Sequence, residues 1–119
     1  MKPQYTLERT ITVNGVETLA QVSVYCEQDD IDLDDVIGDA EDRPAIERKL
    51  ERGDLMIAVI RVEAEALGLS DFSCIGGVCI ESPSDVTDTV SDYDMIHTAC
   101  MYLEATILKQ IETLKPFIK

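Results

Sequence analysis

The alternation of apolar and polar residues predicts a β-hairpin at the start of the chain. Residues 5–13 place Tyr5, Leu7, Ile11 and Val13 on one face, and Arg9 interrupts this pattern. The Asn14-Gly15 pair that follows favours the positive φ angles of a type I′ turn. A returning strand over residues 16–26 then has one face made of Val16, Thr18, Ala20, Val22, Val24 and Cys26.

Two further strands are predicted over residues 54–66 and 70–81. In the first, every even position from 56 to 66 is apolar, whereas the odd positions change from apolar to charged after Val59. This change predicts a strand covered on both faces in its first half and on one face in its second. In the second strand the inward side chains are expected to be Phe72, Cys74, Val78 and Ile80. The Gly76-Gly77 pair within it indicates a β-bulge or a close backbone approach.

Helical spacing predicts two helices. The segment "DRPAIERKLERG" gives a short helix with Asp42 as its cap, Pro44 in its first turn and Gly53 at its end. After a loop over "SPSDVTDTV", Ser91 and Asp94 form a capping-box pattern that opens a helix over residues 92–115. The apolar face of that helix contains Ile96, Ala99, Cys100, Leu103, Ile107, Ile111 and Leu114.

The order of these elements, ββαββα, predicts an α+β fold. We expect a two-layer sandwich in which a four-stranded antiparallel sheet carries helices on one face, with residues 1–119 as a single domain. The first ten residues lack the apolar segment of a secretory signal, and no apolar run reaches the length of a membrane span. We therefore expect a cytoplasmic protein whose four cysteines, at positions 26, 74, 79 and 100, are reduced thiols.

Charge separates this chain from an ordinary globular domain. It has 24 acidic residues against 10 basic ones, a formal net charge of −14. Such a field repels nucleic acid and anionic membranes, and it attracts basic protein surfaces and cations. Nine of the acids fall within residues 27–42, "EQDDIDLDDVIGDAED", where there is no basic residue.

Three interpretations of this acidic stretch stay open: a solvated loop, a surface for a basic partner, and a calcium loop. For the partner surface the candidate contact residues are Asp29, Asp30, Asp32, Asp34, Asp35, Asp39, Glu41 and Asp42. A second acidic patch is expected at Asp85, Asp88 and Asp92. In the calcium interpretation Asp30, Asp32, Asp34 and Glu41 occupy ligand positions one, three, five and twelve of an EF-hand loop, but Asp35 stands where that loop needs glycine.

Catalytic motifs are not evident in the sequence. His97 is the only histidine, and its spacing from the cysteines does not favour a Cys–His pair. There is no C-x-x-C pair to favour zinc or an iron–sulfur cluster, and no G-x-S-x-G elbow. We therefore expect a protein that is not an enzyme and that carries no cofactor and no resident metal.

The segment over residues 52–99 resembles a group of small proteins carried by phages and plasmids. The matching positions are Gly53, Ile75, Gly76, Gly77, Cys79, Glu81, Ser82, Asp94 and Met95. This chain has Ile75 where that group has leucine, Val78 before the cysteine, and no tryptophan in the third strand. Such accessory genes often encode inhibitors of host defences, including anti-CRISPR proteins.

The resemblance and the charge together lead to one expected function. It is a small acidic inhibitor that binds the basic nucleic-acid-binding surface of a defence ribonucleoprotein or nuclease, with carboxylates in the place of phosphates. Two alternatives stay open, namely an immunity protein that neutralises a basic toxin and a calcium-responsive binding module that uses residues 30–41.

Overall fold

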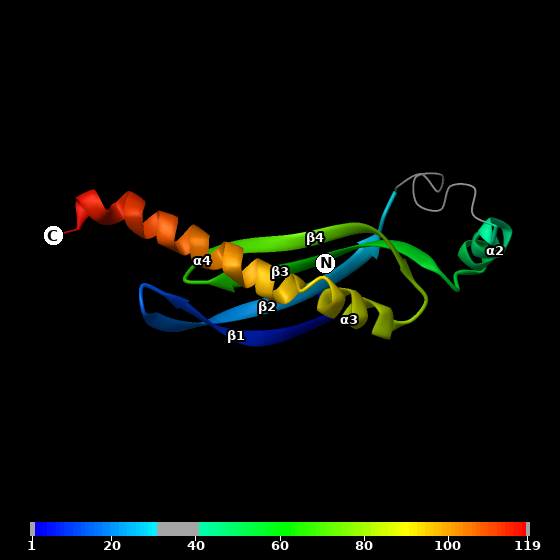
Figure 1. Ribbon diagram of the computed structural model, residues 1–119, viewed down its shortest axis with the longest axis horizontal. Coiled ribbons are helices and arrows are strands. Elements are labelled where there is room, and N and C mark those ends of the chain that lie inside the picture. The colour runs from blue at the N-terminus through cyan, green and yellow to red at the C-terminus, as the bar shows by residue number, and fades with distance from the viewer. Residues whose placement is uncertain (1, 31–40, 119) are drawn as a thin grey trace.

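The fold is built on one antiparallel sheet with two of the three described helices on one of its faces (Figure 1). A computed structural model describes residues 2–30 and 41–118. The strands are β1 (Tyr5–Val13), β2 (Val16–Gln28), β3 (Met56–Ala66) and β4 (Leu69–Ile80), and they lie in the order β1-β2-β3-β4. The helices are α2 (Arg43–Arg52), α3 (Pro83–Asp92) and α4 (Met95–Leu114), followed by the 3₁₀ turn η1 (Lys115–Phe117). The predicted α+β class is confirmed.

The predicted hairpin forms β1 and β2. Val13 lies opposite Val16, and Asn14 and Gly15 between them have φ angles of 52° and 78°. These are the positive angles that a type I′ turn requires. The register continues to Tyr5 opposite Val24, so the apolar sets predicted for the two strands share one face.

That shared face and the helices α3 and α4 enclose the hydrophobic core. The even positions of β3 are buried or half-buried, as predicted, and α4 lies across the sheet above them (Figure 1). The sheet contributes Ile11, Ala20, Val22, Val24, Ala58, Ile60, Val62 and Ala64, and the helices contribute Val86, Val90, Met95, Ala99, Leu103 and Ile107. Ile57 of β3 is buried on the opposite face, whereas Glu65 near the end of β3 is exposed, which agrees with the predicted change along the strand.

In the first half of β4 the prediction of which side chains face the core is wrong. Phe72 and Cys74 are exposed, and the inward positions are those opposite the even residues of β3, such as Asp71 opposite Ala64 and Ile75 opposite Ile60. An inward Asp71 is tolerated because its carboxylate accepts a hydrogen bond of 2.8 Å from the Thr106 hydroxyl of α4. On the outer face, the guanidinium of Arg61 lies 4.4 Å from the centroid of the Phe72 ring and covers it.

The predicted loop over residues 82–90 is also wrong, because these residues form most of α3. The acidic half of the capping box is Asp85, not Asp94: the Asp85 carboxylate accepts the N–H groups of Glu81 at 2.8 Å and Ser82 at 3.1 Å. The helix predicted from residue 92 starts instead at Met95. Asp94, in the left-handed region with φ 51°, separates the two helices.

The far end of α4 extends beyond the sheet (Figure 1). Ala99, Cys100, Leu103 and Ile107 are buried as predicted, but Leu114 is exposed because it lies beyond the described strands. α2 lies past the opposite end of the sheet, and Gly53 ends it in the left-handed conformation with φ 76°, as predicted. The predicted side-chain cap from Asp42 is absent from the described contacts; the Asp42 carbonyl accepts the Ile46 N–H at 3.0 Å.

Candidate functional site

Only the two ends of the acidic stretch, residues 27–30 and 41–42, are among the described residues. Asp30, Glu41 and Asp42 are exposed, and Asp29 is half-buried. The other candidate contact residues, Asp32, Asp34, Asp35 and Asp39, lie outside the described residues. The calcium interpretation needs Asp32 and Asp34 as ligands and therefore also falls outside them.

Asp29 has a structural contact that the sequence did not indicate. Its Oδ2 accepts a hydrogen bond of 2.9 Å from the Gly77 N–H on β4. In the register between β3 and β4, Ile60 pairs with Ile75 and Ala58 with Val78, so two β4 residues, Gly76 and Gly77, lie opposite one β3 residue. This is the β-bulge that the glycine pair predicted, and a carboxylate binds the N–H that the bulge frees from the ladder.

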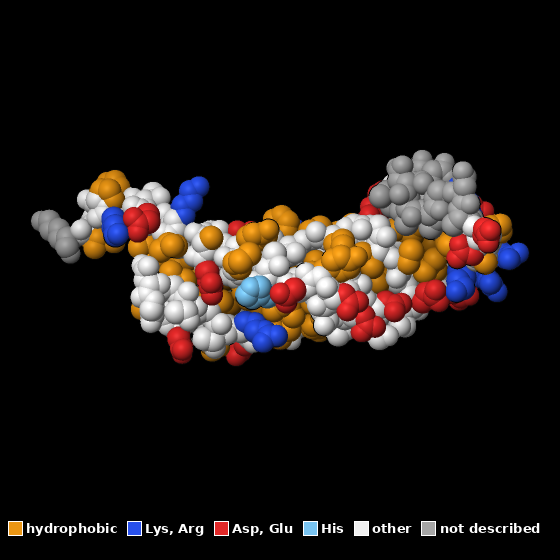
Figure 2. Space-filling view, in the orientation of Figure 1, with side chains coloured by type: hydrophobic (Ala, Val, Ile, Leu, Met, Phe, Trp, Pro, Cys, Tyr) orange, Lys and Arg blue, Asp and Glu red, His pale blue; other side chains and the backbone are white. Residues whose placement is uncertain are grey.

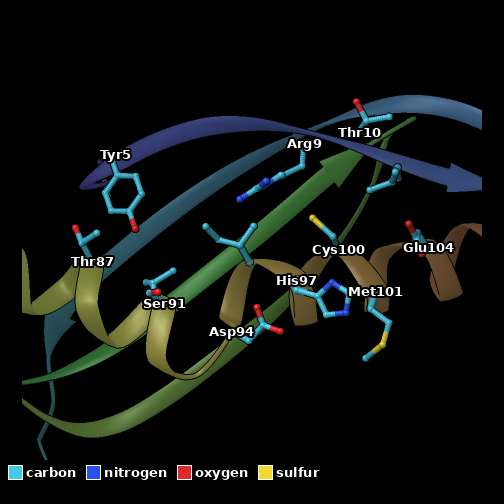
Figure 3. A pocket seen from close by; sticks show the side chains of 13 residues that line it. Tyr5, Arg9, Thr10, Thr87, Ser91, Asp94, His97, Cys100, Met101 and Glu104 are labelled. Carbon is cyan, nitrogen blue, oxygen red and sulfur yellow. The ribbon is translucent and has the colours of Figure 1, made fainter.

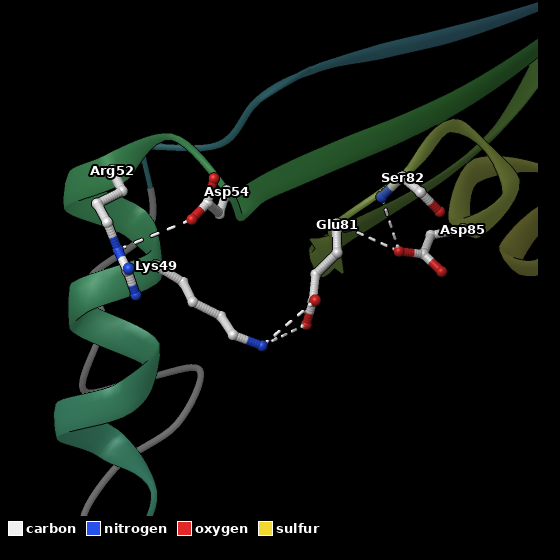
Figure 4. A network of polar contacts seen from close by, with 6 residues as sticks. All are labelled: Lys49, Arg52, Asp54, Glu81, Ser82 and Asp85. Atoms are coloured by element: carbon white, nitrogen blue, oxygen red, sulfur yellow. Dashed lines mark hydrogen bonds and ion pairs between the residues drawn. The ribbon is translucent and has the colours of Figure 1, made fainter.

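The second acidic patch lies on α3. Asp85 is half-buried and its carboxylate is directed at the start of the helix, as Figure 4 shows. Asp88 and Asp92 are exposed and one helical turn apart, and acidic side chains follow α3 across the molecule in Figure 2. We refer to Asp88, Asp92 and the exposed Asp94 as the α3 acidic row.

Two features of the α3 acidic row oppose helix stability. Asp88 and Asp92 are like charges at i and i+4, which repel each other. Asp92 is also the last residue of α3, next to the negative end of the helix dipole, and the last turn holds no basic residue. Within the described residues none of the three carboxylates takes part in an ion pair. The row is therefore available to an external cation.

Basic residues gather in a different place. Four of the ten basic residues of the chain lie in α2, residues 43–52. Three of them have ion-pair partners on the described surface: Arg43 with Glu47 at 2.9 Å, Lys49 with Glu81 at 3.3 Å and Arg52 with Asp54 at 3.7 Å. The last two pairs are drawn in Figure 4. Outside α2, the chain has 22 acidic residues and 6 basic ones.

A groove of about 700 Å³ separates β1 from α3 and α4 (Figure 3). Tyr5 and Arg9 enter it from the strand, and Asp94, His97 and Glu104 from the helical side. Its other lining residues are Thr10, Ile11, Thr87, Val90, Ser91, Ile96, Cys100 and Met101. Sequence reasoning did not identify this groove, because its walls come from segments about 80 residues apart.

The groove brings His97 and Cys100 together without giving the thiol the properties of a nucleophile. Burial raises the pKa of Cys100 above its ordinary value; the positive charge of Arg9 lowers it and the negative charge of Glu104 raises it further. A raised pKa keeps the thiol protonated near neutral pH, whereas a nucleophilic cysteine needs its thiolate. No hydrogen bond joins His97 to Cys100 in the described contacts.

The four cysteines are free thiols in two environments. Cys74 and Cys79 are both exposed on the outer face, because the bulge between them shifts the strand phase, so the predicted core position of Cys74 is wrong. Cys100 is buried and Cys26 is half-buried against the core, as predicted for both. Burial raises the pKa of Cys26 as well, and the Glu27 charge adds to the effect.

These environments predict the order of alkylation. We expect iodoacetamide at neutral pH to modify Cys74 and Cys79 of the folded protein first, because only accessible thiolate reacts quickly. The half-buried Cys26 should react more slowly, and the buried Cys100 should react mainly after urea unfolds the chain. Peptide mass spectrometry of a time course measures the order; early labelling of Cys100 in the native protein would contradict the packing of α4.

Comparison with known proteins gives no relative: no family model, no curated protein and no solved structure matches this chain. Among the described residues no three His, Cys, Asp or Glu side chains are grouped to hold a metal ion. None of the described helices is both long enough and apolar enough to cross a membrane.

Proposed function

We propose that the protein is a non-catalytic inhibitor that binds the basic, nucleic-acid-binding surface of another protein through spaced carboxylates. The observation that carries this proposal is the α3 acidic row. Its three carboxylates are exposed and lack an ion-pair partner within the described residues, and Asp88 and Asp92 repel each other at the end of α3. Selection for stability alone favours a basic residue at the end of a helix. A basic partner would account for the charges, because it turns their repulsion into attraction.

The acidic stretch over residues 27–42 extends the same proposal. Its described members Asp30, Glu41 and Asp42 are exposed and can contact a partner, whereas Asp29 is already bound to the bulge. Carboxylates in such a series can pair with lysine and arginine side chains that otherwise hold phosphates. The narrower form of the proposal, a defence ribonucleoprotein or nuclease as the target, comes from the resemblance of residues 52–99 to phage and plasmid accessory proteins.

The test compares binding and stability in charge-neutralised variants. The partner is first captured from host lysate, and dissociation constants are then measured at low and high salt. We expect the fourfold change of Asp30, Asp32, Asp34 and Asp35 to Asn to weaken binding by several powers of ten, since a desolvated carboxylate at a basic site contributes about 1–3 kcal/mol. Asp88→Asn with Asp92→Asn should weaken it further, and both variants should melt at or slightly above the wild-type temperature.

A matched control separates specific contacts from net charge. Changing four exposed glutamates outside the two acidic surfaces to Gln, namely Glu8, Glu17, Glu51 and Glu65, alters the net charge as much as the fourfold Asn variant does. This control should lose only the long-range attraction, which high salt screens in any case. A control as weak as the fourfold variant, or a fourfold variant as tight as wild type, would overturn the proposed contact residues.

A further inference from the structure

The outer edge of β1 presents backbone groups that none of the described strands pairs with. β1 is the first strand of the sheet, and Val13 and Val16 flank the two-residue turn as a hydrogen-bonded pair. Because such pairs alternate along an antiparallel ladder, the odd-numbered residues of β1 bond to β2. The even-numbered residues, Thr6, Glu8, Thr10 and Thr12, direct their N–H and C=O groups to the open edge.

One contact confirms that the even-numbered residues direct their N–H groups outward, and it shows what kind of group the edge can bind. The N–H of Thr12 donates a hydrogen bond of 3.2 Å to Oε1 of Glu104 on α4. The carboxylate oxygen thus occupies the position of a carbonyl from a neighbouring strand. No described group fills the equivalent positions beside Thr6, Glu8 and Thr10.

The groove between β1 and the helices runs along this same edge. Thr10 lines it, next to the apolar side chains of Ile11, Val90 and Met101 (Figure 3). A smaller hollow of about 290 Å³ lies next to it along Thr12 and Val13, and the two share Met101 and Glu104 in their linings. An open strand edge beside a groove has the form that extended peptides use when they add a strand to a sheet.

We propose that the groove binds an extended polypeptide segment of a partner protein, which pairs with β1 as a fifth strand of the sheet. Alternate side chains of that segment would enter the groove, where its apolar lining takes apolar side chains. A lysine or arginine among them would meet the carboxylates of Asp94 and Glu104 on the helical side. The net charge of −14 favours a basic segment over an acidic one.

The geometry favours this occupant over the two obvious others. A partner helix has no free backbone N–H or C=O along its side, so it would leave the open groups of β1 unpaired. A second copy of this chain would bring an equal charge of −14 to the contact, which opposes association. The strand pairing does not depend on the proposed function, because the pairing groups belong to the backbone of β1. Of the α3 acidic row, only Asp94 also lines the groove.

The first experiment selects peptides and removes one edge donor. Random decapeptides are selected against the folded protein, and we expect enrichment of alternating apolar residues with at least one lysine or arginine. Thr10→Pro removes the outward N–H while leaving the β1–β2 ladder intact, since proline is tolerated on edge strands. It should weaken a selected peptide by about tenfold or more. Thr10→Val keeps the N–H and is the control, with binding close to wild type.

The second experiment probes the pairing without altering the protein. Methylating those peptide nitrogens that face β1 should abolish binding, whereas methylating the alternate nitrogens should not. Amide hydrogen exchange of Thr6, Glu8 and Thr10 should slow on addition of the peptide. Three results would overturn the proposal: no enriched peptide, equal binding by both methylated peptides, or concentration-dependent protection of these amides without peptide, which would identify a second copy as the occupant.

Discussion

Replacing Leu103 with Ala will lower the free energy of unfolding by about 2–5 kcal/mol, the usual range for a fully buried leucine. Leu103 lies in the middle of α4, has 0% of its surface exposed and belongs to the core between that helix and the sheet. The truncation removes apolar contacts and leaves a cavity that neighbours on a long strand cannot readily fill. Urea denaturation followed by circular dichroism measures the change, with the slope of unfolding against urea expected to stay constant.

Leu108→Ala on the same helix is the matched control for this prediction. Leu108 is 41% exposed and lies outside the core cluster, so we expect a loss well under half of that for Leu103→Ala. Both substitutions replace leucine with the better helix former, so the difference between them isolates packing from helix propensity. Equal losses would mean that α4 does not pack on the sheet through the Leu103 face.

The sequence predicted the elements that strong local signals define. The Asn14-Gly15 turn has the predicted positive φ angles, and the predicted hairpin is confirmed, with β2 running to Gln28 where the prediction ended at residue 26. The strand β3 is confirmed as well. It pairs with β2 and β4, and its apolar even positions are the ones that line the core between sheet and helices. Gly53 ends α2 because only its left-handed conformation closes the last turn.

The predictions from sequence are wrong where tertiary contacts, and not the hydrophobicity of a residue, decide which way its side chain points. In β4 the apolar Phe72 suggested an inward position, but the register places the polar Asp71 inward. The hydrogen bond to Thr106 compensates Asp71, and the contact with Arg61 covers Phe72. Neither partner can be identified by the periodicity of β4 itself, because one lies on α4 and the other on β3.

The predicted boundaries of the C-terminal helices are wrong for a related reason. Both Ser82–Asp85 and Ser91–Asp94 have the capping-box spacing, and only the first is used. The segment between them is rich in serine, threonine and aspartate, which are typical of loops. It is helical because Val86 and Val90, one turn apart, are buried against the core. Of the candidate site, the sequence identified Asp88 and Asp92 but not the groove beside β1.

Replacing Gly76 or Gly77 with Val will also destabilise the protein, for a different reason at each position. Gly77 has a φ of 68°, and a β-branched residue in the left-handed region costs about 1–3 kcal/mol. Gly76 lacks a positive φ, but a Cβ atom there would lie 2.9 Å from Oδ2 of Asp29. The carboxylate would have to leave the Gly77 N–H, and loss of a hydrogen bond to a charged group costs about 1.5–3 kcal/mol.

A double-mutant cycle between Gly76→Ala and Asp29→Ala tests this reason at Gly76. Asp29→Ala should destabilise by itself, since it leaves the Gly77 N–H without its carboxylate partner. In that background Gly76→Ala should cost little, because the nearest remaining neighbour of the new Cβ is Cγ2 of Val59 at 4.0 Å, an ordinary contact. The double variant should therefore lose less stability than the two single losses added together, as expected for residues in direct contact.

Gly68→Ala serves as the comparison, because Gly68 has a φ of 75° and nothing within 4 Å of a Cβ, so its cost should not change in the Asp29→Ala background. Strictly additive losses for Gly76→Ala and Asp29→Ala in urea denaturation would show that the Asp29 carboxylate does not restrict position 76.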